Sequence, residues 1–526
     1  AGTSPKKTFL QRVAQGSVIV MDESHKAAGD SNTGKYFMDV LSGTKGVVFL
    51  SATFAKRPDN MPIYATKTAM RDASMTIEQL IEAIRNGGEA LQEVLSSQLV
   101  AEQQLIRRER SFENVEVNWW ALDKSQIETG HPDLNYEDQH KAMSDGATGL
   151  LNSIIKFQEK HVNPYLKAKD KALAAEYQET KEFEGRRKLG VDKYPIFSVV
   201  FNFIYNLLFA IKAEATAKIA IQRLKEGKSV LVVFARTMES FLDNLENDEG
   251  NPIKNGDIIP TDFSSIGKMM LSKTLQYKVK TPERPEPENR TIAINEMNED
   301  MRKAYSDLRK YIEEVSTGIQ FSPIDVLRTL IDDSGFSTEE LTGRSRRLKL
   351  IDNEKAVVES RPKPTITEAI RKFQNNKVDC LLMNQTAATG ASMHAIFKGT
   401  TLSAAEVKQR AMVILQPELD INIEIQKRGR INRVGQIHAP IYDYVVSAVP
   451  SEMRMMFMLR KKLRSLDANT TSSQQTSQRM LDVDDFLNRI GDEIVFKFLE
   501  AHPAFNASIG DPAGINKEGE VDKQNL

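Results

Sequence analysis

The stretch Val18-Ile-Val-Met-Asp22-Glu23-Ser24-His25-Lys26-Ala-Ala-Gly29 carries the strongest fold signal in the sequence. Four apolar residues run directly into two carboxylates, a serine and a histidine. Such an unbroken apolar run is typical of a strand buried on both faces of a parallel sheet, and ligands bind beyond the carboxyl ends of such strands. We therefore expect residues 18–21 to form a buried strand that places Asp22 and Glu23 at a ligand site.

Asp22 and Glu23 have the chemistry that nucleotide hydrolysis needs. Asp22 can hold Mg²⁺ through water, and Glu23 can orient and deprotonate the attacking water molecule. Adjacent side chains point apart on an extended chain, so we expect the two acids to act without competing. These residues alone leave a structural alternative open, because Asp and Ser are also favoured as the amino-terminal caps of a helix that follows a strand.

A second apolar run, residues 46–50, ends in Ser51-Ala52-Thr53. A strand, a short helix and a second strand follow one another up to this point, and that order is typical of a doubly wound α/β sheet. The carboxyl ends of the two strands then face one crevice. We expect Ser51 and Thr53 to report the state of a nucleotide there and their segment to hydrogen-bond to His25. A satisfied, partly buried histidine is the structural alternative for His25.

The composition is that of a soluble globular protein with several domains. At 526 residues the chain exceeds what one hydrophobic core supports, so we expect two or three domains. Lys and Arg (71) balance Asp and Glu (72), so any nucleic-acid surface must be a local patch. The one cysteine, Cys380, excludes an internal disulfide and indicates a reducing compartment. The longest apolar run, residues 196–211, is shorter than the roughly 20 residues that span a bilayer, so we expect no membrane segment.

Hydrophobic periodicity divides the chain into four regions. Residues 1–70 look like the carboxyl-terminal part of a first α/β lobe. The region 71–195 has few strand signals, and we expect a helical insertion or bridge. Alternating strands and helices in 196–470 predict a second α/β lobe, interrupted by a helical subdomain at about 245–365. We expect residues 471–526 to form a last helical segment and a mobile tail.

The segment Gln426-Lys-Arg-Gly429-Arg430-Ile-Asn-Arg433-Val-Gly-Gln436 is the most specific signal. Offsets of three and four would place four residues on one face of a helix: Gln426, Gly429, Arg430 and Arg433. The glycine costs about 1 kcal/mol relative to alanine, and close approach to a phosphate or to a facing lobe would explain it. Two arginines on that face can stabilise the charge that develops on a γ-phosphoryl group, as an arginine finger does. A solvated basic helix is the structural alternative.

The segment Thr386-Ala-Ala-Thr-Gly390-Ala-Ser is a small-residue turn at the end of a predicted strand. Backbone amides in such a turn can approach a phosphate, and Gly390 would allow the closest approach. We assign Thr386 and Thr389 to nucleic-acid binding, together with Arg344 and Arg346 of a basic cluster. A solvated face is the structural alternative for the arginines.

Taken in order, these elements resemble the superfamily two helicases. Residues 22–25 look like motif two, 51–53 like motif three, 386–392 like motif five and 426–433 like motif six. Within this superfamily the chain resembles the strawberry notch family of helicase-like ATPases. The narrower resemblance covers about residues 18–480 and includes the continuation past motif six. Its three most specific stretches are 51–61, 88–94 with 107–112, and 323–327 leading to 342–344.

The resemblance implies a fold of two RecA-like P-loop NTPase lobes with helical insertions. It also implies ATP and Mg²⁺ as cofactors and DNA, rather than RNA, as the favoured partner. Asp22 would hold Mg²⁺, Glu23 would activate water, and two arginines of the second lobe would be catalytic: Arg430 and Arg433. Nucleotide binding and coupling would fall to a larger set: Gln426, Gly429, Gly390, His25, Ser51 and Thr53.

One departure from the family pattern concerns the phosphate-binding loop. A Gly-x-Gly-Lys-Thr pattern or similar should precede the acids by several dozen residues, and residues 1–17 contain nothing like it. We therefore expect the first lobe to be incomplete at its amino terminus here, with the loop upstream or on another chain. The alternative is a non-catalytic DNA-binding or scaffold subunit.

Further partners and the compartment follow only from the resemblance. Strawberry notch relatives occur in animal nuclei and, fused or adjacent to DNA methyltransferases, in bacteria, phages and plasmids. We therefore expect an intracellular protein, cytoplasmic if prokaryotic or phage-encoded and nuclear if eukaryotic, with a DNA methyltransferase or a defence-system subunit as a further partner. A translocase that remodels protein–DNA complexes without separating strands is the main alternative within the enzyme class.

Overall fold

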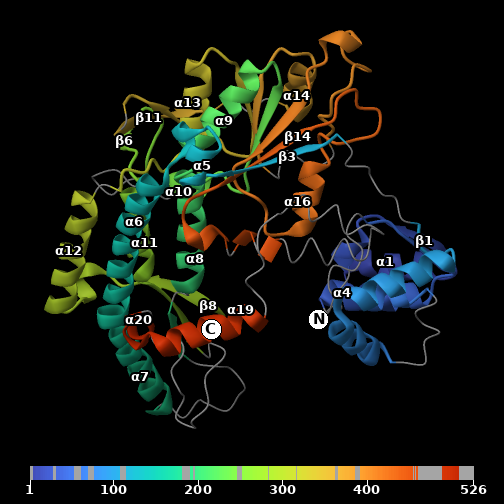
Figure 1. The fold of residues 1–526 in the computed structure, drawn as a ribbon. Helices are drawn as coiled ribbons and strands as arrows, with labels where there is room; N and C mark the ends of the chain where they lie inside the picture. Colours follow the sequence, from blue (N-terminus) through green and yellow to red (C-terminus); the bar gives the residue numbers. More distant parts are fainter. Residues whose placement is uncertain are drawn as a thin grey trace. The chain divides into compact units, whose positions relative to one another are not determined.

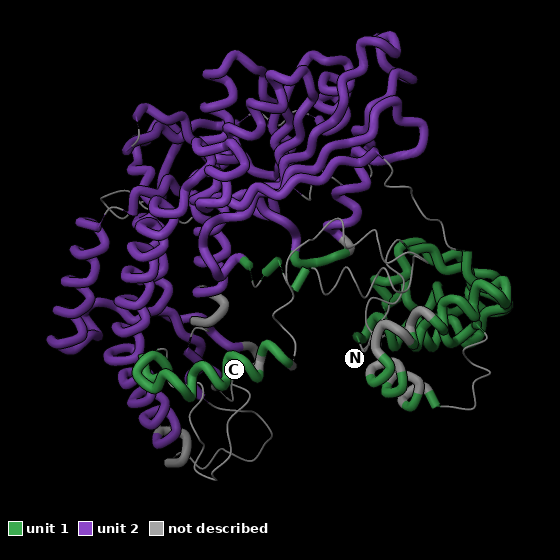
Figure 2. The backbone as a smooth tube through the Cα atoms, viewed as in Figure 1, with its two compact units in different colours: residues 1–113, 419–422, 453–526 green, residues 114–418, 423–452 purple. Residues whose placement is uncertain are grey.

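The computed structural model forms two compact units, shown in Figure 2. Unit 1 comprises residues 1–113, 419–422 and 453–526, and unit 2 comprises residues 114–418 and 423–452. The structure describes these residues: 4–27, 31–51, 61–68, 76–106, 114–179, 190–193, 196–243, 245, 252–281, 284–315, 317–352, 354–361, 365–384, 391–453, 455–456, 458–459 and 489–508.

Unit 2 is built on a six-stranded parallel sheet with the order β3-β14-β13-β5-β12-β9. Every residue of the four inner strands is buried, which is why these strands read as continuous apolar runs. The inner strands are β5 (Ser229–Val233), β12 (Cys380–Met383), β13 (Arg410–Ile414) and β14 (Ile441–Val446). The α/β class that the sequence predicts is therefore confirmed.

The two edge strands of this sheet lie within the expected helical bridge and the expected helical subdomain, although residues 115–120 of the bridge read as a strand in the sequence. β3 (Glu116–Ala121) pairs with β14, and β9 (Thr338–Leu341) pairs with β12. The expected bridge 71–195 and the expected subdomain 245–365 each contribute one strand to the main sheet, and unit 2 begins at residue 114. β9 reads Thr-Glu-Glu-Leu, and an edge strand that tolerates charge gives only a weak apolar signal.

The sequence leaves two uses for Trp119 and Trp120 of β3, stacking on bases or packing in a core. The Trp119 ring stacks on that of Tyr444 with 4.4 Å between centroids, and Trp120 Nε1 donates to Asp443 Oδ1 at 2.9 Å. The buried Asp443 carboxylate also accepts two hydrogen bonds from Arg223. Both indole rings therefore pack inside unit 2.

Helices cover the sheet of unit 2 (Figure 1). α9 (Ala213–Lys225) packs against β5, β13 and α13 (Pro323–Asp333), and α14 (Ile366–Gln374) packs against β9. Beyond α9, Gly227 takes a φ of 77°, as a glycine after the end of a helix predicts. α8 (Ile196–Ala210) holds the longest apolar run, and no helix in the ranges given above is long and apolar enough to cross a membrane.

The rest of unit 2 is a helical layer with two small antiparallel sheets. α6 (Glu137–Phe157), the π-helical turn η5 (Gln158–Val162) and α7 (Asn163–Glu179) follow one another without a break. α11 (Ser264–Thr274) and α12 (Glu299–Glu314) pack against α6. One small sheet has the order β4-β7-β8 and consists of β4 (Gly190–Lys193), β7 (Gln276–Thr281) and β8 (Arg284–Thr291). The other has the order β10-β11-β6 and consists of β10 (Arg346–Leu350), β11 (Lys355–Ser360) and β6 (Ile258–Pro260). Shorter helical elements are α5 (Ser125–Glu128), η4 (Pro132–Leu134), α10 (Glu239–Leu242), η6 (Ile294–Glu296) and η7 (Ala404–Glu406).

Unit 1 contains a two-stranded parallel sheet of β1 (Val18–Met21) and β2 (Gly46–Phe49). The helix α2 (Asn32–Ser42) connects the two strands, in the strand-helix-strand order expected from the sequence. The other helices described in this unit are α1 (Pro5–Ala14), α3 (Met61–Ala65), α4 (Ile77–Ala101), α19 (Arg489–Ala501) and α20 (Pro503–Ser508).

β1 is not buried on both faces. Val18 and Val20 are 62% and 61% exposed, whereas Met21 lies in a core with Leu41 and Tyr64. The described helices α2, α3 and α4 supply the side chains of that core, which covers one face of the strand. The strand is therefore present where it was predicted, but it is half-buried where a fully buried strand was expected.

Candidate functional site

The two acids lie in a tight turn after β1 rather than on an extended strand. β1 ends at Met21, and Lys26 N bonds to Glu23 O at 2.9 Å. Glu23 has a φ of 51°, in the left-handed region that residues with a Cβ rarely occupy. Such strain costs of order 1–3 kcal/mol and clusters at active sites. The expectation of an extended pair is wrong, because a tight turn with a left-handed residue replaces the extended chain.

Asp22 presents an exposed carboxylate at this turn. Its Oδ1 accepts a hydrogen bond from Glu23 N at 3.0 Å. An exposed, locally fixed carboxylate fits Mg²⁺, which keeps several waters and binds one or two carboxylates together with substrate phosphates. The part of the chain that the structure describes has no group of three or more His, Cys, Asp or Glu side chains that could hold a metal.

Glu23, His25 and Ser51 meet at the carboxyl ends of β1 and β2. His25 Nδ1 lies 3.0 Å from Ser51 Oγ and 3.3 Å from Glu23 Oε2. The His25 side chain is 5% exposed and that of Glu23 is 35% exposed, and the Glu23 Oε2 atom beside the histidine is buried. The predicted hydrogen bond between His25 and the Ser51 segment is present.

Tyr64 of α3 supports the same strand ends and is not a residue that the sequence singles out. Its Oη lies 3.3 Å from Ser24 Oγ and also hydrogen-bonds to Ser51. Ser24 N bonds to Leu50 O at 3.0 Å, which ties the turn after β1 to the end of β2. Burial raises the pKa of Tyr64, and the two serine hydrogen bonds offset part of that rise. Only the fold brings this tyrosine to the acids, so no local signal marks it.

The arginine segment is not one continuous helix. α16 (Ile421–Arg428) carries Gln426, whereas Gly429, Arg430 and Arg433 lie in the turns that follow it. The backbone hydrogen bond of Gly429 N still reaches four residues back, but that of Arg430 N reaches only three. The expectation that the four residues share one helical face is wrong, because the helix tightens and stops at the glycine.

Arg430 and Arg433 have different surroundings. Arg430 is 7% exposed, its Nη1 donates to Ala391 O at 3.0 Å, and its O accepts from Met393 N at 2.8 Å. Arg433 is half-buried, and its Nε donates to Gly429 O at 3.1 Å. Arg430 therefore fixes the segment that begins at Ala391, whereas Arg433 keeps a partly exposed guanidinium that the turn orients.

Three buried charged side chains on α16 hold these turns in place. Glu424 Oε2 lies 3.2 Å from Lys427 Nζ, and Glu424 Oε1 accepts from Arg428 Nε at 3.2 Å. Glu424, Lys427 and Arg428 are all buried. Burial alone raises the pKa of Glu424, but the two cations lower it by more, so the pKa is below its usual value. The i,i+3 and i,i+4 spacing of these charges is the sequence signal that could have identified the network.

Gln374 and Arg410 hold the segment that Arg430 contacts. Gln374 Nε2 donates to Ser392 O at 3.2 Å, and Arg410 Nε donates to Met393 O at 3.2 Å. Arg410 Nη2 also donates to Gln374 Oε1 at 2.9 Å. Arg410 is fully buried, and burial lowers its pKa to about 10. Together with Arg430, these two side chains fix the described end of the small-residue turn.

Four predicted site residues lie outside the described residues: Thr53, Thr386, Thr389 and Gly390. The structure describes Ser51, which lies close to Thr53 in the sequence, and Ala391, which follows Gly390 directly. The roles expected of the four residues stay predictions.

Arg344 is buried and does not face nucleic acid. Its guanidinium binds the Asp325 carboxylate at 2.6 and 2.8 Å and the Glu340 carboxylate at 2.7 and 2.8 Å. Burial raises the pKa of Glu340, but the hydrogen bonds and charge of Arg344 outweigh it and hold this pKa at about 2. The assignment of Arg344 to nucleic-acid binding is therefore wrong, because a phosphate would have to displace two carboxylates. Arg346 is partly exposed and pairs with Asp243 at 3.0 Å, so its role stays a prediction.

A cavity of about 420 Å³ lies at the carboxyl ends of β5 and β12. It is lined by Asn206 and Asn384, which are 1% and 9% exposed. Among the described residues, no hydrogen-bond partner occurs for either amide atom of Asn206 or for Asn384 Oδ1. Ligands of parallel α/β sheets bind at this edge, so the cavity belongs to the candidate site of unit 2.

Comparisons with known proteins point to one family. Residues 325–504 match the family model described as the C-terminal domain on Strawberry notch homologue. Over 91% of its length the chain is 22% identical to protein strawberry notch homolog 1 of Rattus norvegicus, and over 92% it is 22% identical to homolog 2 of Mus musculus. A segment of 36% of the chain is 27% identical to homolog 1 of Homo sapiens. The chain spans 42% of the rat protein and 39% of the mouse protein.

One solved structure, the Hef helicase domain of Pyrococcus furiosus, matches 84% of this chain and 73% of its own chain at 12% identity and a TM-score of 0.27. A TM-score this low does not establish a shared arrangement of the whole chain. The fold assignment therefore rests on the sheet topology within each unit.

Proposed function

The chain is similar to the strawberry notch proteins over most of its length and carries their carboxyl-terminal helicase-type domain, and we propose from this that it couples ATP hydrolysis to movement on DNA. The similarity supports a helicase-like protein. ATP turnover, DNA as the substrate and translocation along it are the proposal. The chain covers less than half of the rat and mouse relatives, so the activity proposed is that of the protein that contains this sequence.

The observation that carries the proposal is the contact of His25 with Glu23 and Ser51. A carboxylate that activates water must be oriented, and it must respond to the state of the nucleotide if hydrolysis is to drive movement. His25 Nδ1 touches both Glu23 Oε2 and Ser51 Oγ, so one buried ring connects the turn after β1 to the end of β2. The structural alternative, in which Asp22 and Ser24 cap a helix, requires no such contact.

In this proposal, Asp22 holds Mg²⁺ through water and Glu23 accepts a proton from the attacking water. His25, Ser51 and Thr53 couple that step to the rest of the protein. Residues of unit 2 serve the same hydrolysis. Arg433 stabilises the charge on the transferred phosphoryl group, Arg430 holds the segment from Ala391, and nucleotide contacts fall to Gln426, Gly429 and Gly390.

A magnesium ion, when bound, would neutralise charge on the β- and γ-phosphates and orient them. Asp22 fits it because its carboxylate is exposed and fixed by the Glu23 N–H. A phosphate-binding loop is also part of the proposal. Tests of ATP turnover use the full-length protein, because the chain spans 42% of the rat relative and 39% of the mouse relative.

The variant Glu23→Gln tests the proposal. It keeps the size and the hydrogen-bonding oxygen of the side chain but removes the base, so DNA-stimulated ATP turnover should fall by about 10²–10⁴-fold. DNA binding should be unchanged. The rate of phosphate release with and without DNA measures the first effect, and anisotropy of labelled DNA measures the second.

The matched control is Glu82→Gln, which removes an exposed carboxylate from α4 of the same unit. It should leave turnover at the wild-type value. If Glu23→Gln hydrolysed ATP at the wild-type rate, the catalytic roles assigned to Asp22 and Glu23 would be wrong. Failure of the wild-type protein to bind an ATP analogue at micromolar concentration would favour the scaffold alternative.

Strand separation and duplex translocation are distinguished by substrate. A forked duplex with a labelled strand reports separation, and a labelled triplex-forming strand on intact duplex reports translocation. Displacement of the third strand without displacement of the fork would identify a double-strand translocase that remodels protein–DNA complexes.

A further inference from the structure

The segment 391–394, which contains the described end of the small-residue turn, has an unusual set of hydrogen-bond partners. It belongs to no helix or strand, so regular secondary structure does not satisfy its carbonyl groups. All four carbonyls instead accept hydrogen bonds from side chains that are 17 to 39 residues away in the sequence. These side chains therefore set the position of an otherwise irregular segment.

Gln374 and Arg410 together hold three of the four carbonyls. Gln374, the last residue of α14, donates from Nε2 to Ser392 O at 3.2 Å and to His394 O at 3.4 Å. Arg410, the first residue of β13, donates from Nε to Met393 O at 3.2 Å. Arg410 Nη2 also donates to Gln374 Oε1 at 2.9 Å, so the two side chains act as one pair.

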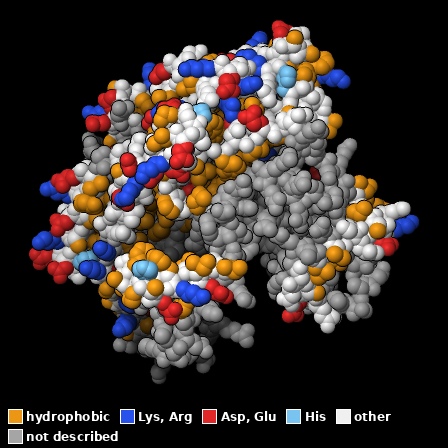
Figure 3. All heavy atoms as spheres, viewed as in Figure 1, with side chains coloured by type: hydrophobic (Ala, Val, Ile, Leu, Met, Phe, Trp, Pro, Cys, Tyr) orange, Lys and Arg blue, Asp and Glu red, His pale blue; other side chains and the backbone are white. Residues whose placement is uncertain are grey.

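Arg410 is a buried cation that no carboxylate compensates in the described part of the chain. On the face of the molecule drawn in Figure 3, Lys and Arg side chains lie at the surface among Asp and Glu side chains. Buried charges are ordinarily paired, as Arg344 is with two carboxylates. Arg410 has only the ring of Phe373, 4.7 Å away, and its Nη1 lacks a hydrogen-bond partner among the described residues.

The glutamine at position 374 explains why this cost is accepted. A glutamate there would place a carboxylate against Arg410 and neutralise the buried charge. A carboxylate only accepts hydrogen bonds, however, so it could not donate to Ser392 O and His394 O. A pair that served only the stability of the core would gain from glutamate. A pair that holds the segment 391–394 requires glutamine.

The held segment in turn fixes Arg430. Arg430 Nη1 donates to Ala391 O at 3.0 Å, and Met393 N donates to Arg430 O at 2.8 Å. Both the side chain and the backbone of this arginine therefore depend on where the segment lies. A displacement of the segment would move Arg430 and, at the same time, the end of the turn that is predicted to bind nucleic acid.

We propose that Gln374 and Arg410 are positioning residues for the ATP hydrolysis proposed above. They act without touching the nucleotide, by holding the segment 391–394 in register with Arg430. The inference rests on the proposed function, because it names the side chains that connect the predicted nucleic-acid turn to the arginine turns. It also gives a buried pair of unusual chemistry a role that stability does not supply.

The variant Gln374→Glu tests the inference in the full-length protein. It keeps the acceptor for Arg410 but replaces both donors by an oxygen that repels Ser392 O and His394 O. The DNA-stimulated kcat for ATP should fall about 10–100-fold, because a displacement of about 1 Å at a catalytic group has an effect of this size. The KM for ATP should stay within about twofold of the wild-type value.

The variant Gln374→Met separates positioning from stability. It removes both donors and also leaves Arg410 Nη2 without its acceptor, so its kcat should fall as far as that of Gln374→Glu. Its urea unfolding midpoint should be the lower of the two, because the glutamate pairs with the buried cation. If the pair were only structural, kcat would instead follow the unfolding midpoint.

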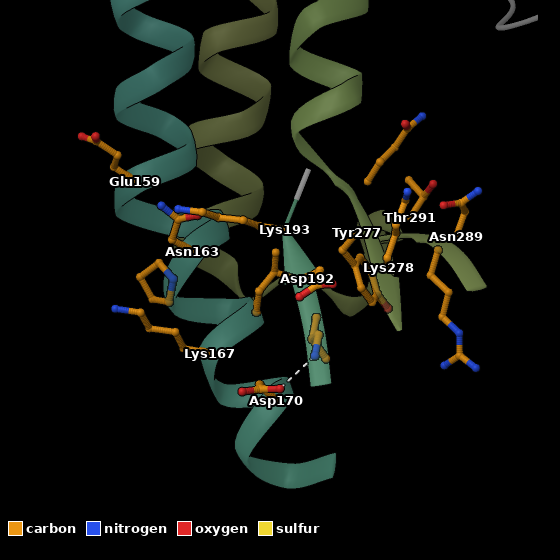
Figure 4. A pocket seen from close by; sticks show the side chains of 15 residues that line it. Glu159, Asn163, Lys167, Asp170, Asp192, Lys193, Tyr277, Lys278, Asn289 and Thr291 are labelled. Atoms are coloured by element: carbon orange, nitrogen blue, oxygen red, sulfur yellow. Dashed lines mark hydrogen bonds between the residues drawn. The ribbon is translucent and has the colours of Figure 1, made fainter. Parts of the chain in front are cut away.

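Two control variants should keep the wild-type kcat. Gln409→Glu makes the same change beside another cation: Gln409 Oε1 accepts from Lys228 Nζ at 2.7 Å, and its Nε2 donates to Ala439 O at 2.8 Å. Lys167→Ala lies in a groove of about 1120 Å³ formed by η5, α7 and the small sheet β4-β7-β8 (Figure 4). No residue that lines this groove belongs to α14, β13 or the segment 391–394.

The outcomes separate the inference from the proposed function. If Gln374→Glu turns over ATP as fast as Gln409→Glu, or faster than Gln374→Met in the order of their midpoints, the positioning role is overturned and the proposed function is untouched. If Gln374→Glu unfolds at a lower urea concentration than Gln374→Met, the charge argument is overturned. If the wild-type protein shows no DNA-stimulated turnover, the proposed function itself fails.

Discussion

At the candidate site, one histidine nitrogen lies close to two other side chains. His25 Nδ1 is within 3.3 Å of both Glu23 Oε2 and Ser51 Oγ, and the ring is nearly inaccessible to solvent. We infer that this contact keeps the Glu23 carboxylate in one position relative to the end of β2. Because Ser51 Oγ lies beside the same nitrogen, we expect a change at the end of β2 to alter the position of Glu23.

Removal of the Ser51 hydroxyl should weaken this control. In Ser51→Ala, a hydrogen bond worth about 1 kcal/mol is lost, so DNA-stimulated ATP turnover in the full-length protein should fall about fivefold. Affinity for an ATP analogue should stay within about twofold of wild type. Phosphate-release kinetics and analogue titration measure the two quantities. The coupling role is refuted if Ser51→Ala responds to DNA as the wild-type protein does.

At the scale of single residues, the sequence predicted which side chains form the candidate site better than it predicted their backbone conformation. The positions of Asp22, Glu23, His25 and Ser51 follow from where two apolar runs end, because parallel strands place their carboxyl ends together. The left-handed φ of Glu23 could not be predicted from the sequence. Glycine, and to a lesser extent Asn, Asp and His, are the residues that are enriched in that region, and glutamate is not. Tyr64 was missed for a related reason, because its place beside Ser24 depends on the packing of α3.

At the scale of elements, α16 acts as a support for the arginine turns. Its carboxylate Glu424 is buried between Lys427 and Arg428 and also accepts a hydrogen bond from Glu418 N at 2.9 Å. Removing one member of a buried ionic group leaves its partners charged and uncompensated, which costs more than the group contributes when intact.

The variant Glu424→Gln should therefore be strongly destabilised. We expect a loss of about 3–5 kcal/mol in the free energy of unfolding of unit 2, because two buried cations lose their carboxylate. Urea denaturation followed by tryptophan fluorescence reports this unit, since Trp119 and Trp120 both lie in its core. Glu128→Gln, an exposed site on α5, is the control and should unfold at the wild-type midpoint. Equal midpoints for the two variants would contradict a structural role for Glu424.

Element boundaries show where periodicity stops being informative. The strands β5, β12, β13 and β14 were predictable because strands buried on both faces are mostly apolar, even where β14 includes the buried Asp443. β9 reads Thr-Glu-Glu-Leu and was not, because an edge strand tolerates charge. The end of α16 at Arg428 was missed because the offsets of Gln426, Gly429, Arg430 and Arg433 also fit a continuous helix.

At the scale of the whole molecule, the stability of unit 2 should depend on pH through His140. This fully buried side chain of α6 accepts from Ala448 N at Nδ1, so its proton is on Nε2, which lies 3.1 Å from Ile211 O. Burial is the main reason that its pKa is lowered to about 4. The folded unit therefore holds His140 neutral at pH values where the unfolded chain, with a pKa near 6.5, would protonate it.

The sign of the effect follows from this difference. Between pH 6.5 and 4 the unfolded chain binds one proton more than the folded chain. The contribution of neutral His140 to the free energy of unfolding is therefore complete above pH 6.5 and is lost as the pH falls toward 4. The loss amounts to about 3 kcal/mol at about 1.4 kcal/mol per pH unit. Urea midpoints measured from pH 7 to 4.5 should fall more steeply for the wild-type protein than for His140→Gln. Parallel curves would rule out His140 as the source.

We propose that residues of both units serve one ATP hydrolysis. Asp22 and Glu23 belong to unit 1, and Arg430 and Arg433 belong to unit 2. Residues that act in one chemical step show strongly non-additive losses, because the second substitution removes a contribution that the first has already abolished. A cycle of variants therefore tests the claim without reference to how the units are placed.

The deciding measurement is the DNA-stimulated rate of phosphate release by four full-length proteins: wild type, Glu23→Gln, Arg433→Ala and the double variant. An arginine at the transferred phosphoryl group contributes about 10³–10⁵-fold, so each single variant should lose at least about 10²-fold in rate. The double variant should be no slower than the slower single variant. Wild-type turnover by Arg433→Ala, or losses that multiply in the double variant, would contradict a shared hydrolysis.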